Sequence, residues 1–245
     1  MSRTSHQIES KQLSSNTSVS VRASHKGARL DQPLWGVHWF NARNALLSSL
    51  YNIFLFPIFQ QVGAEVLFKG HFIKKIEGKA DYDRHNLQIE CYPNATSFLE
   101  LASLGIYKIL YPLFKLANRE VVFGFSKRLD NGSKPSHKAR KYWGSEHYLI
   151  HIYQADRAFV LSKQFALSEV AYKHGVRLYF SGSTEALMTR THRNNQIHYP
   201  FFMDGILVFE GTSETALMDM KNDEKYKQFQ EKTSRSSLYF FKREI

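Results

Sequence analysis

The chain has 245 residues, 43% of them apolar and 14% aromatic, which is enough to bury a sizeable core. It contains no uninterrupted apolar run of about 18 residues, so the sequence predicts no membrane span, and its single cysteine, Cys91, excludes an intramolecular disulfide and a cysteine-built zinc site. The formal net charge of +11 indicates attraction to anions without identifying a partner. Low cysteine content suits a reducing compartment, so we expect a cytoplasmic protein.

The first half of the chain predicts a tail followed by a strand–helix–strand–strand–helix–strand unit. Residues 1–32 are rich in serine and poor in large apolar side chains, which is typical of a disordered tail. The unit itself covers 33–129. Asn41 or Asn44 is expected to cap a helix over 45–61, and Pro57 should kink or shorten this helix. A second helix begins at Thr96 or Ser97 and runs to about residue 118. The expected strands cover 34–40, 65–74, 86–92 and 120–127.

The second half repeats this order over 147–245, after a segment of linker composition at 130–146. Its expected strands cover 148–154, 176–181, 205–210 and 237–242, and its expected helices cover 158–174 and 213–233. A fixed spacing near 115 residues indicates duplication. Three pairs carry the repeat: Gly70 with Gly182 at the ends of second strands, Tyr107 with Tyr226 in second helices, and Lys127 with Lys242 in fourth strands.

Each copy has the β-α-β-β-α-β order of the ferredoxin-like motif, so we expect an α+β fold. Both faces of most strands carry apolar residues, and two copies can cover each other in a closed barrel. The chain therefore resembles the dimeric α/β-barrel superfamily with two repeats fused in tandem. The stretch 89–112 is similar to small uncharacterised members of that superfamily, with Tyr92, Pro93 and Tyr107 at the matching positions. The second copy departs, because Gly211 and Thr212 replace the tyrosine–proline pair.

This resemblance implies a ligand cleft either between sheet and helices or inside the barrel. It implies a small-molecule enzyme, such as a cofactor-independent monooxygenase, cyclase or isomerase, acting on an apolar or aromatic metabolite, with an acidic metabolite as an open alternative. No cofactor is predicted, with haem as an alternative that needs one axial histidine. A monomeric pseudo-dimer or a homodimer is expected. Fold alone does not select among these activities.

Strand alternation suggests which side chains share a face. Trp35, Val37 and Trp39 share one face of the first strand, and we expect such purely apolar faces to meet the helices. The mixed faces should then line the barrel interior. They carry His38, Lys69, His71, Gln88, Glu90 and Tyr92. Because histidine titrates near neutral pH, we predict that His38, His71 or His151 is a general base, with Glu90 or Tyr92 as its partner.

Further polar residues are candidates for ligand binding, and several alternatives stay open. The candidates are Lys69, Gln88, Tyr153, Arg177, Tyr179, Arg190 and Arg193, the last two in a long loop over 189–200 that could close on an anionic ligand. All of these residues could instead be satisfied interior or surface residues of a non-catalytic ligand-binding or scaffold protein. Lys69–Phe72 weakly resembles an RNA-recognition signature, although on the wrong strand. A metal held by His38, His71 and Glu90 has no supporting spacing, so no metal is predicted.

Overall fold

The computed structural model describes residues 19–23, 32–78, 85–129, 147–190 and 204–244. In this part of the chain, the strands are β1 (Val19–Ala23), β2 (Leu34–Ala42), β3 (Glu65–Gly78), β4 (Asn86–Tyr92), β5 (Asn118–Arg128), β6 (His147–Gln154), β7 (Val176–Arg190), β8 (Gly205–Gly211) and β9 (Ser234–Arg243). The helices are α1 (Ala45–Gln61), α2 (Ala95–Ser103), α3 (Gly105–Ala117), α5 (Arg157–Lys173), α6 (Glu214–Asn222) and α7 (Glu224–Glu231).

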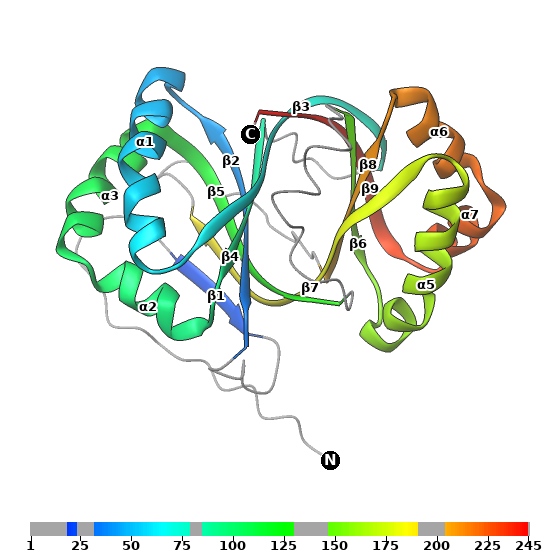
Figure 1. Ribbon diagram of the computed structural model, residues 1–245, viewed down its shortest axis with the longest axis horizontal. Coiled ribbons are helices and arrows are strands. Elements are labelled where there is room, and N and C mark those ends of the chain that lie inside the picture. The colour runs from blue at the N-terminus through cyan, green and yellow to red at the C-terminus, as the bar shows by residue number, and fades with distance from the viewer. Residues whose placement is uncertain (1–18, 24–31, 79–84, 130–146, 191–203, 245) are drawn as a thin grey trace, which may run out of the picture.

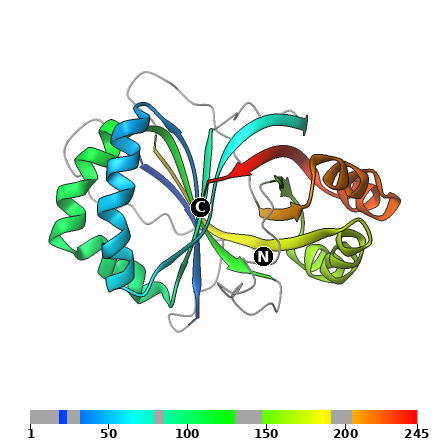
Figure 2. The same cartoon turned by 45° about the horizontal axis from the view of Figure 1, so that its top comes forward.

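Eight of these strands close into one antiparallel barrel. The order runs β7-β5-β2-β4-β3-β9-β6-β8, and β8 pairs again with β7. Helices α1–α3 cover one side of the barrel and α5–α7 cover the opposite side (Figures 1 and 2). The predicted α+β fold of two ferredoxin-like repeats in one pseudo-dimeric barrel is therefore confirmed.

The two long strands β3 and β7 join the repeats in the same way. The first part of β3 pairs with β4 and its second part with β9, while β7 pairs first with β8 and then with β5. Each strand carries a β-bulge at the same place, after Val66 in β3 and after Leu178 in β7. A bulge bends a strand and increases its twist, which lets one strand belong to two half-sheets.

Gly70 and Gly182 occupy equivalent positions just beyond these bulges. A Cβ at Gly70 would lie 2.7 Å from the ring of Phe68, and a Cβ at Gly182 would lie 2.7 Å from the ring of Phe180. The predicted equivalence of the two glycines is thus confirmed, but their predicted place at strand ends is wrong. Both lie within long strands, because the strands continue past the bulge to pair with the other repeat.

The second helix of each repeat is broken, which corrects the two single helices expected from sequence. Leu104 separates α2 from α3, and Asp223 separates α6 from α7. The residue spacing between the two breaks equals that between Tyr107 and Tyr226. Asn94, rather than Thr96 or Ser97, caps α2 by accepting from the backbone of Ser97.

Two further expectations change near the N-terminus. Val19–Ala23 fall inside the expected tail but form β1, which pairs with the second half of β7 along the edge that β8 leaves uncovered. Alternating valines suit such an added strand. Helix α1 keeps its predicted bounds with Asn44 as its cap, and it continues through Pro57.

In the described part of the chain no single helix is long and apolar enough to cross a bilayer. Helices α2 and α3 taken together, with a bend of 81° between them, have the length and apolar composition of a membrane span.

In β2 and β4 the strand faces are grouped as predicted, but they point the other way. In β3 the predicted grouping of Val66 with Phe68 is wrong, because the bulge after Val66 puts Leu67 and Phe68 together in the barrel interior and leaves Val66 on the helix side. The purely apolar face of Trp35, Val37 and Trp39 lies in the barrel interior, where it packs against Tyr148 and Tyr239 of the other repeat. The mixed face of β2 and β4 meets the helices. The interior of a closed barrel is walled by both repeats and must be filled by side chains, so the strictly apolar faces belong there.

Candidate functional site

A cavity of about 140 Å³ lies between the sheet of repeat 1 and helices α1–α3. Strands β2, β4 and β5 form its floor, and α1, α2 and α3 form its walls. Its lining consists mostly of aromatic and aliphatic side chains, with a smaller number of polar groups, as is usual for small-molecule sites. The lining residues are His38, Phe40, Ser48, Tyr51, Asn52, Leu55, Phe59, Gln88, Glu90, Tyr92, Phe98, Leu101, Tyr107, Tyr111, Phe114, Asn118, Val121 and Phe123.

Glu90 is the polar centre of this pocket. Its side chain is 1% exposed, and both of its carboxylate oxygens have partners. The Gln88 amide donates to Oε1, and the Tyr92 hydroxyl donates to Oε2 at 2.5 Å. His38 Nε2 lies 3.1 Å from Oε2, close enough for an ion pair but poorly aligned for a hydrogen bond. Strand pairing brings these groups together, since β2 and β4 are neighbours with His38 opposite Gln88.

These contacts keep the Glu90 carboxylate charged although it is fully buried. Burial raises its pKa, but the electrostatic interaction with His38 and the hydrogen bonds from Tyr92 and Gln88 outweigh burial and hold the pKa below its ordinary value. The ring of His38 packs edge-on against Phe123, with the ring centres 3.9 Å apart. Its side chain keeps 18% of its surface exposed. The imidazole is thus held between a fixed carboxylate and the cavity.

The helices add three tyrosines that sequence reasoning missed: Tyr51 from α1, and Tyr107 and Tyr111 from α3. Burial and the Glu90 charge raise the pKa of Tyr107 to about 12, so this hydroxyl stays neutral. Burial likewise raises the pKa of Tyr51. They were missed because the helix-facing side of the sheet was expected to be purely apolar. The pairing of Tyr107 with Tyr226 was the available signal.

Gly36 leaves the space above the carboxylate open. A Cβ there would lie 3.3 Å from Nε2 of His38, 3.4 Å from the Tyr92 ring and 3.5 Å from Oε2 of Glu90. A larger residue would therefore crowd all three groups at once.

Lys69 and His71 share the face of Gln88 by strand pairing but do not reach the pocket. Both lie towards the C-terminus of the chain, where Lys69 Nζ is 3.0 Å and His71 Nδ1 is 3.4 Å from the Glu244 carboxylate. This placement puts His71 beside Glu244 and outside the pocket lining that contains Glu90 and Tyr92, its predicted partners. Across the described residues, no group of three or more His, Cys, Asp or Glu side chains is placed to hold a metal ion.

His151 occupies the position in β6 that His38 occupies in β2, but its surroundings are closed. Its Nδ1 lies 2.8 Å from the Tyr226 hydroxyl and its Nε2 lies 2.7 Å from the Ser236 hydroxyl. Burial lowers its pKa from 6.5 to about 3, so the ring is neutral. Tyr153 packs beside it against Phe229.

The polar positions of β4 are apolar at the equivalent places in β8. Strand pairing places Leu207, Phe209 and Gly211 where repeat 1 has Gln88, Glu90 and Tyr92. A Cβ at Gly211 would lie 2.6 Å from the Leu217 side chain, so that space is filled. Among the described residues, the His–Glu–Gln–Tyr arrangement therefore occurs in repeat 1 and not at the equivalent strand positions of repeat 2.

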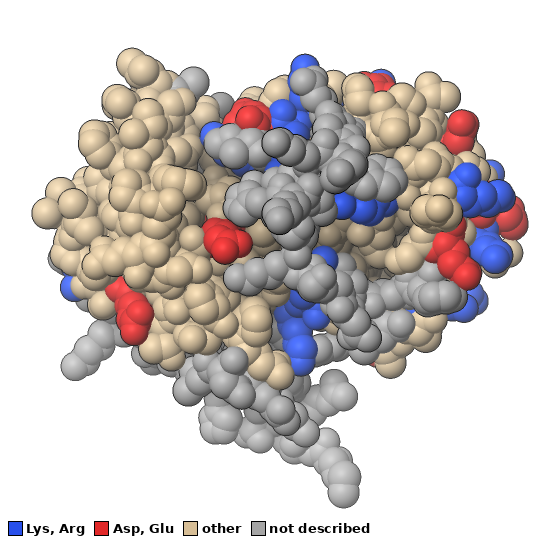
Figure 3. Space-filling model, in the orientation of Figure 1, with Lys and Arg blue, Asp and Glu red and all other residues tan. Residues whose placement is uncertain are grey.

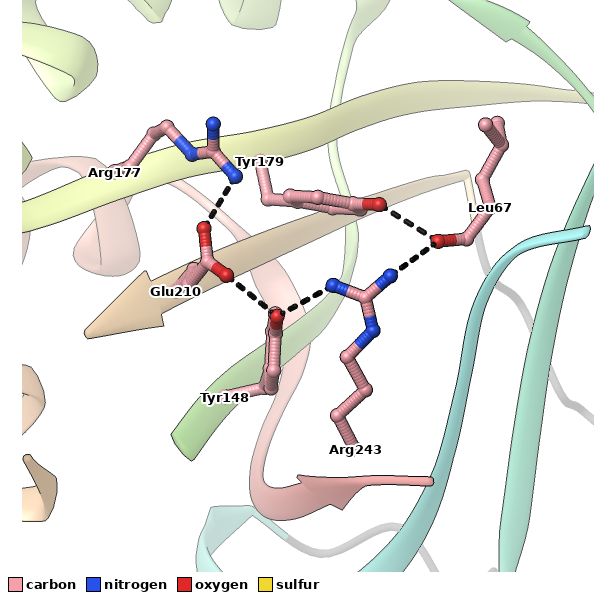
Figure 4. A network of polar contacts seen from close by, with 6 residues as sticks. All are labelled: Leu67, Tyr148, Arg177, Tyr179, Glu210 and Arg243. Atoms are coloured by element: carbon pink, nitrogen blue, oxygen red, sulfur yellow. Dashed lines mark hydrogen bonds and ion pairs between the residues drawn. The ribbon is translucent and has the colours of Figure 1, made fainter. Parts of the chain in front are cut away.

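Arg177 and Tyr179 belong to a different polar network, inside one end of the barrel (Figure 4). Glu210 accepts from Arg177 and from the Tyr148 hydroxyl at 2.6 Å. Arg243 donates to Tyr148 at 3.1 Å. Arg243 and Tyr179 both donate to the Leu67 carbonyl of β3, at 3.2 and 2.7 Å. This network ties the repeats together, so we assign these two candidates a structural contact rather than a place in the pocket.

Two ligand-binding candidates remain, Arg190 and Arg193, both from the expected loop over 189–200. Arg190 ends β7, and only its backbone pairing is described. Arg193 lies outside the described residues, as do the expected lid and the linker at 130–146.

Comparisons with known proteins identify the fold. No protein-family model and no curated sequence matches the chain. A candidate monooxygenase from Fusobacterium nucleatum subsp. nucleatum aligns over 86% of this chain and 92% of its own, with 9% identity and a TM-score of 0.50. An anthrone oxidase-like protein aligns over 92% and 95%, with 9% identity and a TM-score of 0.53. At this identity the likeness is one of fold.

Proposed function

We propose that this chain, which has the tandem dimeric α/β-barrel fold, is an enzyme that uses His38 as a general base on a small aromatic ligand. The observation that carries the proposal is the His38–Glu90 pair at the wall of the repeat 1 pocket, with Nε2 and Oε2 3.1 Å apart. A histidine beside a buried carboxylate can gain a proton without leaving an isolated buried charge.

The roles follow from the contacts. Glu90 is saturated by Gln88, Tyr92 and His38, and its pKa lies below the ordinary value, so it orients and neutralises rather than exchanging protons. His38 is the histidine of the pocket lining, and histidine is the residue type most often used as a general base. It takes a proton from an acidic C–H or O–H of the ligand, which leaves a ligand anion beside an imidazolium. Tyr107, which stays protonated, is a hydrogen-bond donor for that anion.

The cavity limits the ligand. An engineered cavity of about 150 Å³ in another protein binds benzene, so about 140 Å³ suits a single ring with small substituents. Drug-sized ligands use pockets of roughly 300 Å³ or more, and a macrocycle such as haem exceeds this cavity. The proposal therefore keeps the expectation of chemistry without a bound cofactor.

The names of the two structural neighbours favour dioxygen as the co-reactant. In such a reaction His38 removes one proton from an activated CH₂, the carbanion transfers electrons to O₂, and formation of a carbon–oxygen bond with return of the proton gives a hydroperoxide. Removal of the second hydrogen from that carbon and cleavage of the O–O bond then leave C=O, so one oxygen atom enters the product and the other leaves as water. Without oxygen uptake, returning the proton to another ligand atom would give an isomerase or a cyclase instead.

4-Nitrophenol tests the site, because its absorbance reports whether its hydroxyl is ionised. We expect the protein to bind it and to increase the phenolate fraction over that in buffer at the same pH. His38→Gln should still bind it but lose this increase, while His71→Gln, changed outside the pocket, should behave as the wild type.

Binding without ionisation in the wild-type protein would contradict the general-base role and support the competing view of a non-catalytic ligand-binding protein. Loss of binding in His71→Gln, with binding retained in Gly36→Ala, would contradict the assignment of the pocket itself.

A further inference from the structure

The outer surface of α1–α3 exposes many large apolar side chains and few charged ones, unlike the surface of a helical layer that faces water. Helix α1 contains no charged residue, and α2 and α3 together contain only Glu100, Lys108 and Lys115. Large apolar side chains point outwards from all three helices. Six of them define what we call the apolar helix face: Leu46, Ile53, Phe54, Leu99, Ile109 and Leu116. Ile53 is 64% exposed and Ile109 is 74% exposed.

The other repeat provides an internal comparison. Helices α5–α7 have the same place in the fold but carry eleven charged residues. Tyr172 is the one large hydrophobic side chain that they expose strongly among the described residues, at 80%. Figure 3 shows the contrast: the side formed by α1–α3 is nearly free of charged groups, whereas the side formed by α5–α7 carries many. An exposed apolar face of this extent marks an interaction surface.

The charges beside the face indicate which kind of surface it meets. Lys108 and Lys115 lie on α3, the helix that also exposes Ile109, and Lys115 Nζ lies 4.8 Å from the centre of the Tyr111 ring. Lysines with long apolar stems and tyrosines are the side chains found where a bilayer meets water. The whole chain carries a net charge of +11, which complements an anionic surface.

We propose that the apolar helix face docks on an anionic lipid bilayer, with α1 and α3 lying on the membrane surface and the barrel outside it. The fold supports this arrangement, because the sheet-to-sheet contact that holds two repeats together is already made within the chain. Tyr111 is partly exposed on α3 and also lines the pocket. The edge of the pocket thus lies beside the apolar helix face. The proposal does not depend on the chemistry of His38.

Vesicle flotation of the full chain tests this proposal. We expect the protein to float with vesicles of phosphatidylcholine and phosphatidylserine and to bind vesicles of phosphatidylcholine alone more weakly. Ile53→Glu with Ile109→Glu should weaken binding at least tenfold, because each change removes an apolar side chain that docking would bury in the bilayer and adds a charge. Tyr172→Glu, at an equally exposed position on α5, should leave binding unchanged. Lys108→Ala with Lys115→Ala should weaken binding about fivefold per lysine.

Three results would overturn the proposal. The wild-type protein could stay unbound with both kinds of vesicle, or Tyr172→Glu could weaken binding as much as the double change on the apolar helix face. In the third case, sedimentation velocity without vesicles would show a dimer that Ile53→Glu with Ile109→Glu converts to monomer, and the face would then be a contact between two copies. Circular dichroism of each variant shows whether the fold is retained. Ionisation of 4-nitrophenol by the protein with Ile53→Glu and Ile109→Glu, which are outside the pocket lining, tests the catalytic proposal separately from vesicle binding.

Discussion

His38 and His151 occupy equivalent positions in the two repeats, yet they lie in opposite chemical environments. His38 on β2 faces the Glu90 carboxylate across 3.1 Å at the edge of a cavity. His151 on β6 is fully buried between the hydroxyls of Tyr226 and Ser236. The strand position is shared, and the partners supplied by the neighbouring strand and helices decide whether the ring can take part in chemistry.

His151 should make the protein sensitive to acid. Burial lowers its pKa from 6.5 to about 3. Between these two pH values the unfolded chain therefore binds a proton at His151 that the folded chain does not bind. As the pH falls from 6.5 to about 3, this residue should therefore lower the free energy of unfolding by about 1.4 kcal/mol per pH unit. Above pH 6.5 the residue contributes no pH dependence.

Urea denaturation at several pH values measures this slope. His151→Gln keeps hydrogen-bonding capacity but does not titrate, so its slope below pH 6.5 should be shallower than that of the wild type. Equal slopes would show that His151 already becomes protonated in the folded protein.

Gly36→Ala should close the space above the carboxylate while leaving the chain folded. The added Cβ meets His38, Tyr92 and Glu90 at 3.3–3.5 Å, which neighbouring side chains can accommodate with small shifts. We expect 4-nitrophenol binding to weaken about tenfold or more. Gly105→Ala at the start of α3 is the control, because a Cβ there meets nothing within 4 Å. It should leave binding unchanged and leave stability equal or about 0.5–1 kcal/mol higher.

Gly70→Ala and Gly182→Ala should destabilise the barrel to a similar degree. In each case the new Cβ lies 2.7 Å from a phenylalanine ring two residues earlier, Phe68 or Phe180. Overpacking of this kind costs about 1–3 kcal/mol. Adding Phe180→Leu to Gly182→Ala should recover part of the loss, which a double-mutant cycle measured by urea denaturation would show. Fully additive effects would mean that the ring is not what the Cβ meets.

Glu210→Ala should be among the most destabilising changes in the chain. It leaves Arg177 without its carboxylate and removes the acceptor of the Tyr148 hydroxyl inside the barrel. Breaking a buried ion pair from one side costs about 3–5 kcal/mol. Glu214→Ala removes a comparable pair with Lys74, 2.6 Å apart but exposed, and should cost less than about 1 kcal/mol. Thermal unfolding of the two variants checks the difference.

Local pattern was enough to predict most of the elements and their repetition. Runs of β-branched and aromatic residues marked the strands, and Asn44 was one of two asparagines predicted to cap α1. It was not enough for the helix breaks at Leu104 and Asp223, because a single residue between two helical stretches leaves the periodicity almost unchanged. Nor could it show β1, whose stability depends on pairing with residues far along the chain.

The sequence by itself determined that His38, Gln88, Glu90 and Tyr92 share one face of the sheet, because side chains alternate along paired strands. Only the tertiary structure decided that this face meets the helices. Alternation says which residues lie together and not which side of the sheet becomes the barrel interior. That choice depends on the second repeat, whose own apolar face must also be buried, and it brings Tyr51 and Tyr107 from distant helices to the same carboxylate.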